Sequence, residues 1–305
     1  MDVTFRLGTQ DDALSASRII GAALSDLNVR QGRAPLSESH DEAAPVLRHL
    51  TRTDGDRFWI AQAAGMPVAV GTAFVRGPLS LLAGLFVLPE WQGKGVGRAL
   101  LERALEGQPP PGGVTALTSS AANPLSNGLY SRHGIYALCP MLTLEGRLDQ
   151  LTAHPRLGTL EVEPLRRSHV PYLTEIDAVV TGTDRSVDHR WLIDEPGHGG
   201  WLFRRGGRAV GYAYAGGDGT EGENALGPVA TRRPQDQGVV LRYCLAELAA
   251  RGRKHAVLMV PGVNLHAQRL LWRAGFAFDG AAGLLCASRP FGRFDRYVLA
   301  GDCLM

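Results

Sequence analysis

Residues 85–100 combine features that few folds can accommodate in so short a stretch. An apolar run ends at Val87, and Pro89 follows it. Proline has no N–H for a sheet ladder, so a strand is expected to end there. Glycines, which let backbone amides close around an anion, then alternate at Gly93, Gly95 and Gly97. Apolar residues recur at helical spacing from Arg98 onward. The segment predicts a strand, a phosphate loop and a helix N-terminus, where free N–H groups and the helix dipole favour a pyrophosphate.

The glycine spacing separates this loop from two other phosphate-binding loops. The dinucleotide pattern Gly-x-Gly-x-x-Gly places its third glycine one residue later than Gly97. The P-loop pattern Gly-x-x-x-x-Gly-Lys-Ser/Thr occurs nowhere in the chain. An ordinary glycine-rich turn between a strand and a helix is the alternative that needs no ligand.

The segment resembles the acetyl-CoA loop of the GCN5-related N-acetyltransferases, the GNAT superfamily. That loop reads Gln/Arg-x-x-Gly-x-Gly/Ala after a Val-x-Pro strand, and here its positions are held by Gln92, Gly95 and Gly97 after Val87 and Pro89. The resemblance implies acetyl-CoA as co-substrate and no metal. The residues that it implies for cofactor binding are Phe86, Val87, Gln92, Gly93, Lys94, Gly95, Val96, Gly97, Arg98 and Asn123.

A second element of the family lies downstream, where Asn123 precedes Tyr130 and the pair Gly134 and Ile135 closes the segment. The family usually has Gly-Phe there, so the isoleucine is a departure. By resemblance, Asn123 hydrogen-bonds the pantetheine or phosphate region and Tyr130 lies near the thioester sulfur. A phenol with a pKa near ~10 stays protonated at neutral pH, so Tyr130 is the expected catalytic acid for the departing thiolate. Both have structural alternatives: Asn123 before Pro124 suits a helix N-cap, and Tyr130 suits packing on a sheet.

The arrangement occurs twice in the chain. Asn264 follows Asn123 by 141 residues, and Gly275 follows Gly134 by the same 141 residues. The same offset relates two further pairs, Gly97 with Gly238 and Leu100 with Leu241. One offset shared by separated landmarks indicates a duplication.

The two copies are chemically different. The offset places Pro234 opposite Gly93, Asp236 opposite Gly95 and Leu271 opposite Tyr130. The proline removes an amide donor, the aspartate adds a negative charge where a pyrophosphate would lie, and the leucine cannot move a proton. The second copy is therefore expected to have lost the cofactor site and to be structural or acceptor-binding.

Length and composition agree with two domains. The 305 residues suit two units of about 150 residues, each large enough to bury a core. The predicted fold is α/β with mixed α+β sheets: two tandem GNAT-like domains, each with a mixed, mostly antiparallel sheet flanked by helices. The expected boundaries are 1–147 for the N-terminal, acetyl-CoA-binding and catalytic domain, 148–158 for a linker, and 159–305 for the degenerate C-terminal domain.

Charge and cysteine content limit the partners. The formal net charge is only +2 and no long basic run occurs, so no nucleic-acid partner is expected. No apolar run is long enough to span a membrane, the N-terminus lacks the pattern of a signal peptide, and the four cysteines form no Cys-x-x-Cys pair. We expect a cytoplasmic protein that is a monomer or a homodimer and does not act on membranes.

The expected reaction is direct attack by a primary amine, from a small molecule or a peptide, on acetyl-CoA in a ternary complex. A free backbone N–H near Val87 would polarise the thioester carbonyl. The amine must first lose a proton, yet residues 77–88 contain no carboxylate. Glu38, His40, Asp41 and Glu42 lie on a polar stretch expected beside the acceptor, and no base is assigned. The missing base favours one alternative, a non-catalytic acyl-CoA-binding or sensing protein; a nucleotide-dependent oxidoreductase is a third.

Overall fold

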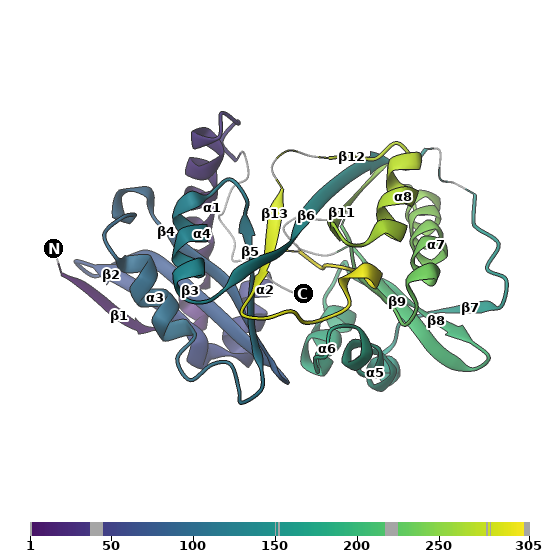
Figure 1. The fold of residues 1–305 in the computed structure, drawn as a ribbon, viewed down its shortest axis with the longest axis horizontal. Coiled ribbons are helices and arrows are strands. Elements are labelled where there is room, and N and C mark those ends of the chain that lie inside the picture. The colour runs from purple at the N-terminus through teal and green to yellow at the C-terminus, as the bar shows by residue number, and fades with distance from the viewer. Residues whose placement is uncertain are drawn as a thin grey trace. The chain divides into compact units, whose positions relative to one another are not determined.

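The chain separates into two compact units. The computed structural model describes residues 2–36, 45–149, 151, 153–216, 225–278, 280 and 282–301. Unit 1 comprises Met1–Thr118 and Ala122–Tyr136, and unit 2 comprises Ser119–Ala121 and Ala137–Met305. Figure 1 labels most of their helices and strands. By contacts, the first unit therefore ends before residue 147, the predicted end of the first domain.

Unit 1 is built on strands in the order β1-β2-β3-β4-β5, which are antiparallel neighbours except for the parallel pair β4 and β5. The strands are β1 (Val3–Leu7), β2 (Phe58–Ala63), β3 (Met66–Arg76), β4 (Leu79–Val87) and β5 (Val114–Ser120). The helices are α1 (Ala13–Arg30), α2 (Pro45–Thr53), α3 (Val96–Ala104) and α4 (Pro124–Arg132). Because β4 and β5 are parallel, their connection has to cross over, and α3 provides it.

Helices cover both faces of this sheet because its central strands are apolar on both sides. Ile60 packs with residues of α1 and α2, whereas the next residue, Ala61, packs with Val96 and Leu100 of α3. Successive side chains of a strand point to opposite faces, so the two helical layers lie on opposite sides of β2 and β3.

Unit 2 repeats this plan. An antiparallel sheet has the order β14-β10-β9-β8-β7, and β6 pairs with β11 and β12. The strands are β6 (Tyr136–Arg147), β7 (Leu160–Pro164), β8 (Gly199–Arg205), β9 (Arg208–Ala215), β10 (Leu226–Thr231), β11 (His255–Pro261), β12 (Ala277–Phe278), β13 (Gly283–Ala287) and β14 (Tyr297–Val298). The helices are α5 (Val170–Val180), α6 (Ser186–Asp194), α7 (Gln237–Ala250) and α8 (Leu265–Arg273). β6 lies mostly in unit 2, where it pairs with β11 from Met141 to Arg147.

The duplicated landmarks have the same structural roles in both units. Leu100 on α3 and Leu241 on α7 are both fully buried. Gly134 and Gly275 end α4 and α8 with φ of +74° and +80°, a conformation that favours glycine. The prediction of a mixed α/β chain made of two tandem repeats is confirmed.

Individual elements were predicted unevenly. The sequence of residues 3–7 predicts a strand, and apolar residues at helical spacing predict a helix from about Asp11 to Leu27. The structure has β1 and α1 there, with α1 running from Ala13 to Arg30. Helices α2 and α6 and strands β10, β13 and β14 were not predicted. Among the described residues, no helix has the length and apolar character that crossing a membrane requires.

Candidate active site

Strand β4 parts from its parallel neighbour halfway along its length. It pairs with β5 only as far as Leu82, and its register with β3 shifts just beyond that point. The N–H of Leu88 donates to the carbonyl of Val68 on the other side, at 3.0 Å. Because hydrogen-bonded pairs alternate in an antiparallel ladder, the N–H groups of Leu85 and Val87 point away from β3. The last half of β4 thus has a backbone edge without a strand partner.

The glycine loop begins where this edge ends. A 3-10 turn at Pro89–Trp91 stops the strand, and residues 92–95 lead into α3. Gly93 and Gly95 have φ of +73° and +84°, so residues with a Cβ would be strained there. Both are exposed, and an added Cβ would meet no atom within 4 Å. The glycines are therefore needed for backbone conformation, and the space around them is open to a ligand.

Gln92 fastens the loop to the strand and to α1. Its Nε2 donates to the carbonyl of Val87 at 3.0 Å, and its Oε1 accepts from Nη2 of Arg30 at 2.7 Å. Arg30 is in turn hydrogen-bonded to Asp26, one helical turn earlier. Sequence reasoning selected Gln92 but missed Arg30, because no local pattern links residues so far apart in the chain.

The loop presents backbone donors without protein acceptors. The first N–H groups of α3, those of Val96, Gly97 and Arg98, have no intrahelical partner. Within the described part of the chain, none of these amides and none of those at residues 93–95 donates to a protein group. Nζ of Lys94 lies 4.8 Å from the ring centroid of Trp91, so a cation is held at the loop as well. Free donors, the positive end of a helix and a cation suit a diphosphate.

Asn123 and Tyr130 lie on α4, seven residues and therefore about two turns apart, on one face. Oδ1 of Asn123 accepts the N–H of Ser126 at 3.2 Å, which makes Asn123 the N-cap. Its Nδ2 has no partner among the described residues. Tyr130 is buried, with 6% of its surface exposed. The structural alternative for Asn123 is thus present, and its amide remains free to donate elsewhere.

Sheet topology brings these pieces to one edge. The carboxyl ends of parallel neighbours meet at the same edge of a sheet, so the loop after β4 and the start of α4 after β5 lie at that edge. Phe86 and Val87 lie at the end of β4, with Phe86 packed toward α1 and Val87 toward α3. Glu38, His40, Asp41 and Glu42 lie outside the described residues, so the structure places no group from that stretch.

The sequence of this region matches a known domain. Residues 54–134 match the family model of the acetyltransferase (GNAT) domain. Unit 1 carries a GNAT domain. The matched segment runs from the end of α2 to the glycine that ends α4, and it contains the open edge of β4, the glycine loop, Asn123 and Tyr130.

Solved structures with the GNAT fold resemble nearly the whole chain. A putative acetyltransferase from Pyrococcus horikoshii has a TM-score of 0.75 at 15% identity, over 99% of this chain and 96% of that one. A GCN5-related N-acetyltransferase from Sphaerobacter thermophilus has 0.65 at 20% identity, over 96% and 98%. A tandem GNAT protein from the clavulanic acid biosynthesis pathway has 0.60 at 14% identity, over 95% and 99%. No curated protein matches significantly. The chain has the fold of tandem GNAT proteins.

Unit 2 lacks the loop. Its 3-10 turn at Pro234–Asp236 runs directly into α7, so Pro234 corresponds to Pro89 of unit 1 and not to Gly93, as the offset had implied. Gly97 follows Pro89 by eight positions in unit 1, whereas Gly238 follows Pro234 by only four in unit 2. The loop has therefore been shortened, not merely substituted.

The carboxylate of Asp236, which the sequence offset placed opposite Gly95, forms an ion pair within unit 2. Asp236 precedes α7 and accepts two hydrogen bonds from Arg205, at 2.7 and 3.1 Å. Leu271, at the position of Tyr130, is fully buried. This end of unit 2 has neither the glycine loop nor the phenol of the GNAT domain in unit 1.

Proposed function

We propose that the protein transfers the acetyl group of acetyl-CoA to a primary amine, at a single site in unit 1. The observation that carries this proposal is the series of unpaired amides at residues 93–98, placed directly after the open edge of β4. The loop supplies donors for the diphosphate, and the edge supplies donors for the extended arm that ends in the thioester. We propose that Asn123 donates its free Nδ2 to the same arm.

The chemistry follows from the groups at this edge. An N–H of β4, at Leu85 or Val87, donates to the thioester carbonyl and stabilises the charge that develops on its oxygen during attack. The amine nitrogen forms a bond to the carbonyl carbon as the carbon–sulfur bond breaks, and the phenol of Tyr130 gives its proton to the sulfur. Neither step needs a covalent enzyme intermediate, so both substrates bind together.

One observation favours a second function. Strand β4 carries no carboxylate and no imidazole, so the amine has to lose its proton to water or to a group on another element. A protein that only binds acyl-CoA and senses it would need no such group. Both functions require the glycine loop for binding acyl-CoA, and only the acetyltransferase would release free CoA.

The deciding experiment measures release of free CoA thiol from acetyl-CoA with a panel of amines: a polyamine, an aminoglycoside, a lysine peptide and a peptide with a free N-terminus. Thiol release that depends on the amine, with the acetylated amine found by mass spectrometry, supports direct transfer. Saturable binding without thiol release from any amine supports the sensor. An acetylated protein formed without amine would contradict attack in a ternary complex.

A further inference from the structure

In unit 2, a strand from the end of the chain occupies the place that is open in unit 1. Strand β14 pairs with β10 through Val298 opposite Val229 and Tyr297 opposite Ala230. The N–H of Leu299 donates to the carbonyl of Met259 on β11, at 3.0 Å. Since β10 and β11 correspond to β4 and β5, the segment Tyr297–Leu299 lies in the slot between the two parallel strands.

The N-cap asparagine of unit 2 holds this segment. Asn264 is fully buried and accepts the N–H of Ala267 at 3.0 Å, as Asn123 accepts that of Ser126. Its Nδ2 donates to the carbonyl of Tyr297 at 3.0 Å. The amide that is free in unit 1 is thus used in unit 2 to bind a backbone carbonyl.

A glycine makes room for the segment. A Cβ added to Gly227, at the start of β10, would lie 2.0 Å from the carbonyl oxygen of Leu299. The contact is with backbone, which cannot move aside as a flexible side chain would. Only glycine at this position allows Leu299 to approach β10 so closely.

The side chain of Tyr297 is bound as well. Its hydroxyl accepts a hydrogen bond from Nη1 of Arg185, which is fully buried beside α5 and α6. Burial opposes the charge of this guanidinium, but Tyr297 and Asp177 stabilise it and keep its pKa above the ordinary value. Nη2 of Arg185 has no hydrogen-bond partner among the described residues.

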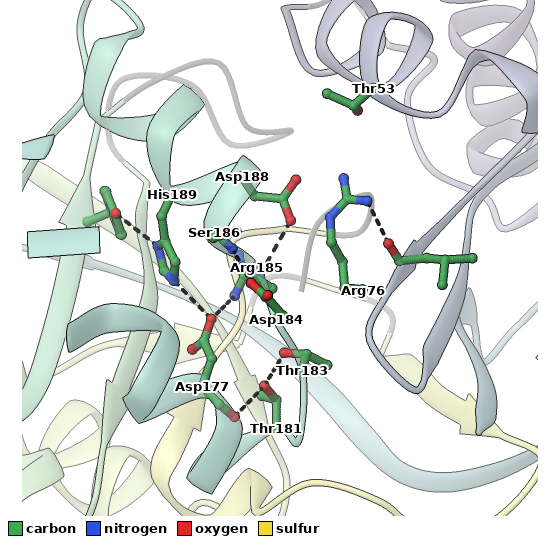
Figure 2. Close-up of polar contacts among 12 residues, drawn as sticks. Thr53, Arg76, Asp177, Thr181, Thr183, Asp184, Arg185, Ser186, Asp188 and His189 are labelled. Carbon is green, nitrogen blue, oxygen red and sulfur yellow. Dashed lines mark hydrogen bonds and ion pairs between the residues drawn. The ribbon is translucent and has the colours of Figure 1, made fainter. Parts of the chain in front are cut away.

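A polar network surrounds that contact. Figure 2 shows Asp177, Arg185 and His189 converging between the helices. Nε2 of His189 lies 2.9 Å from Oδ2 of Asp177, and Nδ1 of His189 lies 3.0 Å from the hydroxyl of Tyr214. Each of these groups is at least 98% buried. Each hydrogen bond lost here would leave a further buried polar group unpaired, so the network depends on the phenol of Tyr297.

We propose that the slot of unit 2 is a binding site for an extended peptide backbone and that its ligand is the chain's own segment Tyr297–Leu299. The strand edge and Asn264 bind the backbone, and Arg185 binds the phenol of the first residue. With the loop shortened, the slot has no diphosphate site and selects an uncharged backbone. The statement that this slot corresponds to the acetyl-CoA site of unit 1 rests on the proposed function. The binding of Tyr297–Leu299 in the slot does not depend on it.

The test begins with hydrogen–deuterium exchange of the full chain without ligand. The peptide covering Arg293–Leu299 should exchange at least 100-fold more slowly than the same free peptide. Gly227→Ala should speed that exchange at least tenfold. Gly238→Ala is the matched control, because a Cβ there meets no atom within 4 Å, and it should leave the exchange unchanged. Exchange of the wild-type segment at the rate of the free peptide would overturn the proposal, whether or not any variant folds.

A binding experiment tests the slot itself. Val298→Pro removes the N–H through which the segment pairs with β10, and should leave the slot open. A fluorescent peptide with the sequence of Arg293–Gly301 should then bind this variant at least tenfold more tightly than it binds the wild type, whereas a peptide with proline at the position of Val298 should not bind. Equal binding to both proteins would contradict the proposal. Failure of acetyl-CoA to bind unit 1 would refute the proposed function and leave these results unaffected.

Discussion

The two units have corresponding strands, β4 in unit 1 and β10 in unit 2, but the hydrogen-bond partners at the ends of these strands differ. In unit 1 the strand edge beyond Leu82 has no strand partner among the described residues, and a glycine loop follows it. In unit 2 the corresponding edge pairs with β14, and the turn runs straight into α7. The same fold thus leaves these hydrogen-bonding groups open in one unit and satisfies them within the chain in the other, and we propose that this difference leaves unit 2 without a cofactor site.

The largest expected effect comes from placing a negative charge in the loop of unit 1. Gly95→Asp brings a carboxylate against the proposed diphosphate and forces a side chain into a positive φ. We expect the affinity for acetyl-CoA to fall at least ~100-fold, which is about 2.7 kcal/mol. Gly107→Asp is the control, because Gly107 also has a positive φ, +69°, but follows α3. Titration calorimetry should show its affinity unchanged; an equal loss in both variants would assign the effect to misfolding.

The next effect is expected on kcat, from removing the hydroxyl of Tyr130, whose counterpart in unit 2 is Leu271. Tyr130→Phe should lower kcat by about 100-fold and leave KM for acetyl-CoA nearly unchanged, because the proton donor acts only as the thiolate departs. Tyr136→Phe, at a tyrosine that is 58% exposed, should leave kcat unchanged. Steady-state kinetics of thiol release checks both. An unchanged kcat in Tyr130→Phe would show that the tyrosine only packs.

The two N-cap asparagines allow the same substitution in each unit. Aspartate keeps the cap acceptor and removes the Nδ2 donor. Asn123→Asp should weaken acetyl-CoA binding about tenfold, with little change in the free energy of unfolding. Asn264→Asp should lower the free energy of unfolding by about 1–3 kcal/mol, because the buried carbonyl of Tyr297 loses its donor, and leave acetyl-CoA binding unchanged. Calorimetric titration with acetyl-CoA should show a loss of affinity only in Asn123→Asp, and denaturant titration should show a loss of stability only in Asn264→Asp. Loss of affinity in Asn264→Asp would contradict it.

The smallest effect is expected from protonating one ion pair of unit 1, that of Asp12 with Arg6. Arg6 hydrogen-bonds both oxygens of Asp12, at 2.7 and 2.8 Å, and lowers the pKa of that carboxyl from 3.8 to about 2. Because the pKa is lowered on folding, the stabilisation is present above pH 4 and is lost as the pH falls toward 2. The Arg6 side chain is 40% exposed, so solvent screening limits the contribution to about 1 kcal/mol.

Asp12→Asn tests this contribution. It should destabilise the protein by about 1 kcal/mol at pH 7 and by much less near pH 2, where the folded-state carboxyl is half protonated, with exposed Asp11→Asn as the neutral neighbour. Denaturant midpoints measured from pH 7 to pH 2 test this expectation. A destabilisation as large at pH 2 as at pH 7 would exclude the ion pair as its cause.

What could be predicted from the sequence was local. The end of β4 at Val87 follows from Pro89, and a helix from Arg98 onward follows from the spacing of apolar residues, although α3 begins two residues earlier, at Val96. The interpretation of Asn123 as an N-cap follows from its place before Pro124, and the structure has Asn264 as an N-cap at the corresponding position of unit 2. These features depend on a few neighbouring residues, and local rules are strongest there.

What could not be predicted depends on distant contacts. Strand β14 has two residues, and it exists because Val298 meets β10 and the next residue meets β11. By their sequence alone, Phe291, Phe294 and Tyr297 suit the lining of a small pocket as well as the cover of a sheet. In the structure Tyr297 is fully buried. The offset of 141 residues also misaligned Pro234, because a constant offset cannot reveal a shortened loop. The link between Arg30 and Gln92 spans 62 residues and leaves no local signal.

The most direct test of this account is the number of acetyl-CoA molecules bound per chain, measured by titration calorimetry of the wild-type protein. With the site of unit 1 open and the slot of unit 2 occupied by Tyr297–Leu299, we predict one molecule per chain and no second binding phase. Two molecules per chain, or one that still binds after Gly95→Asp, would contradict the account.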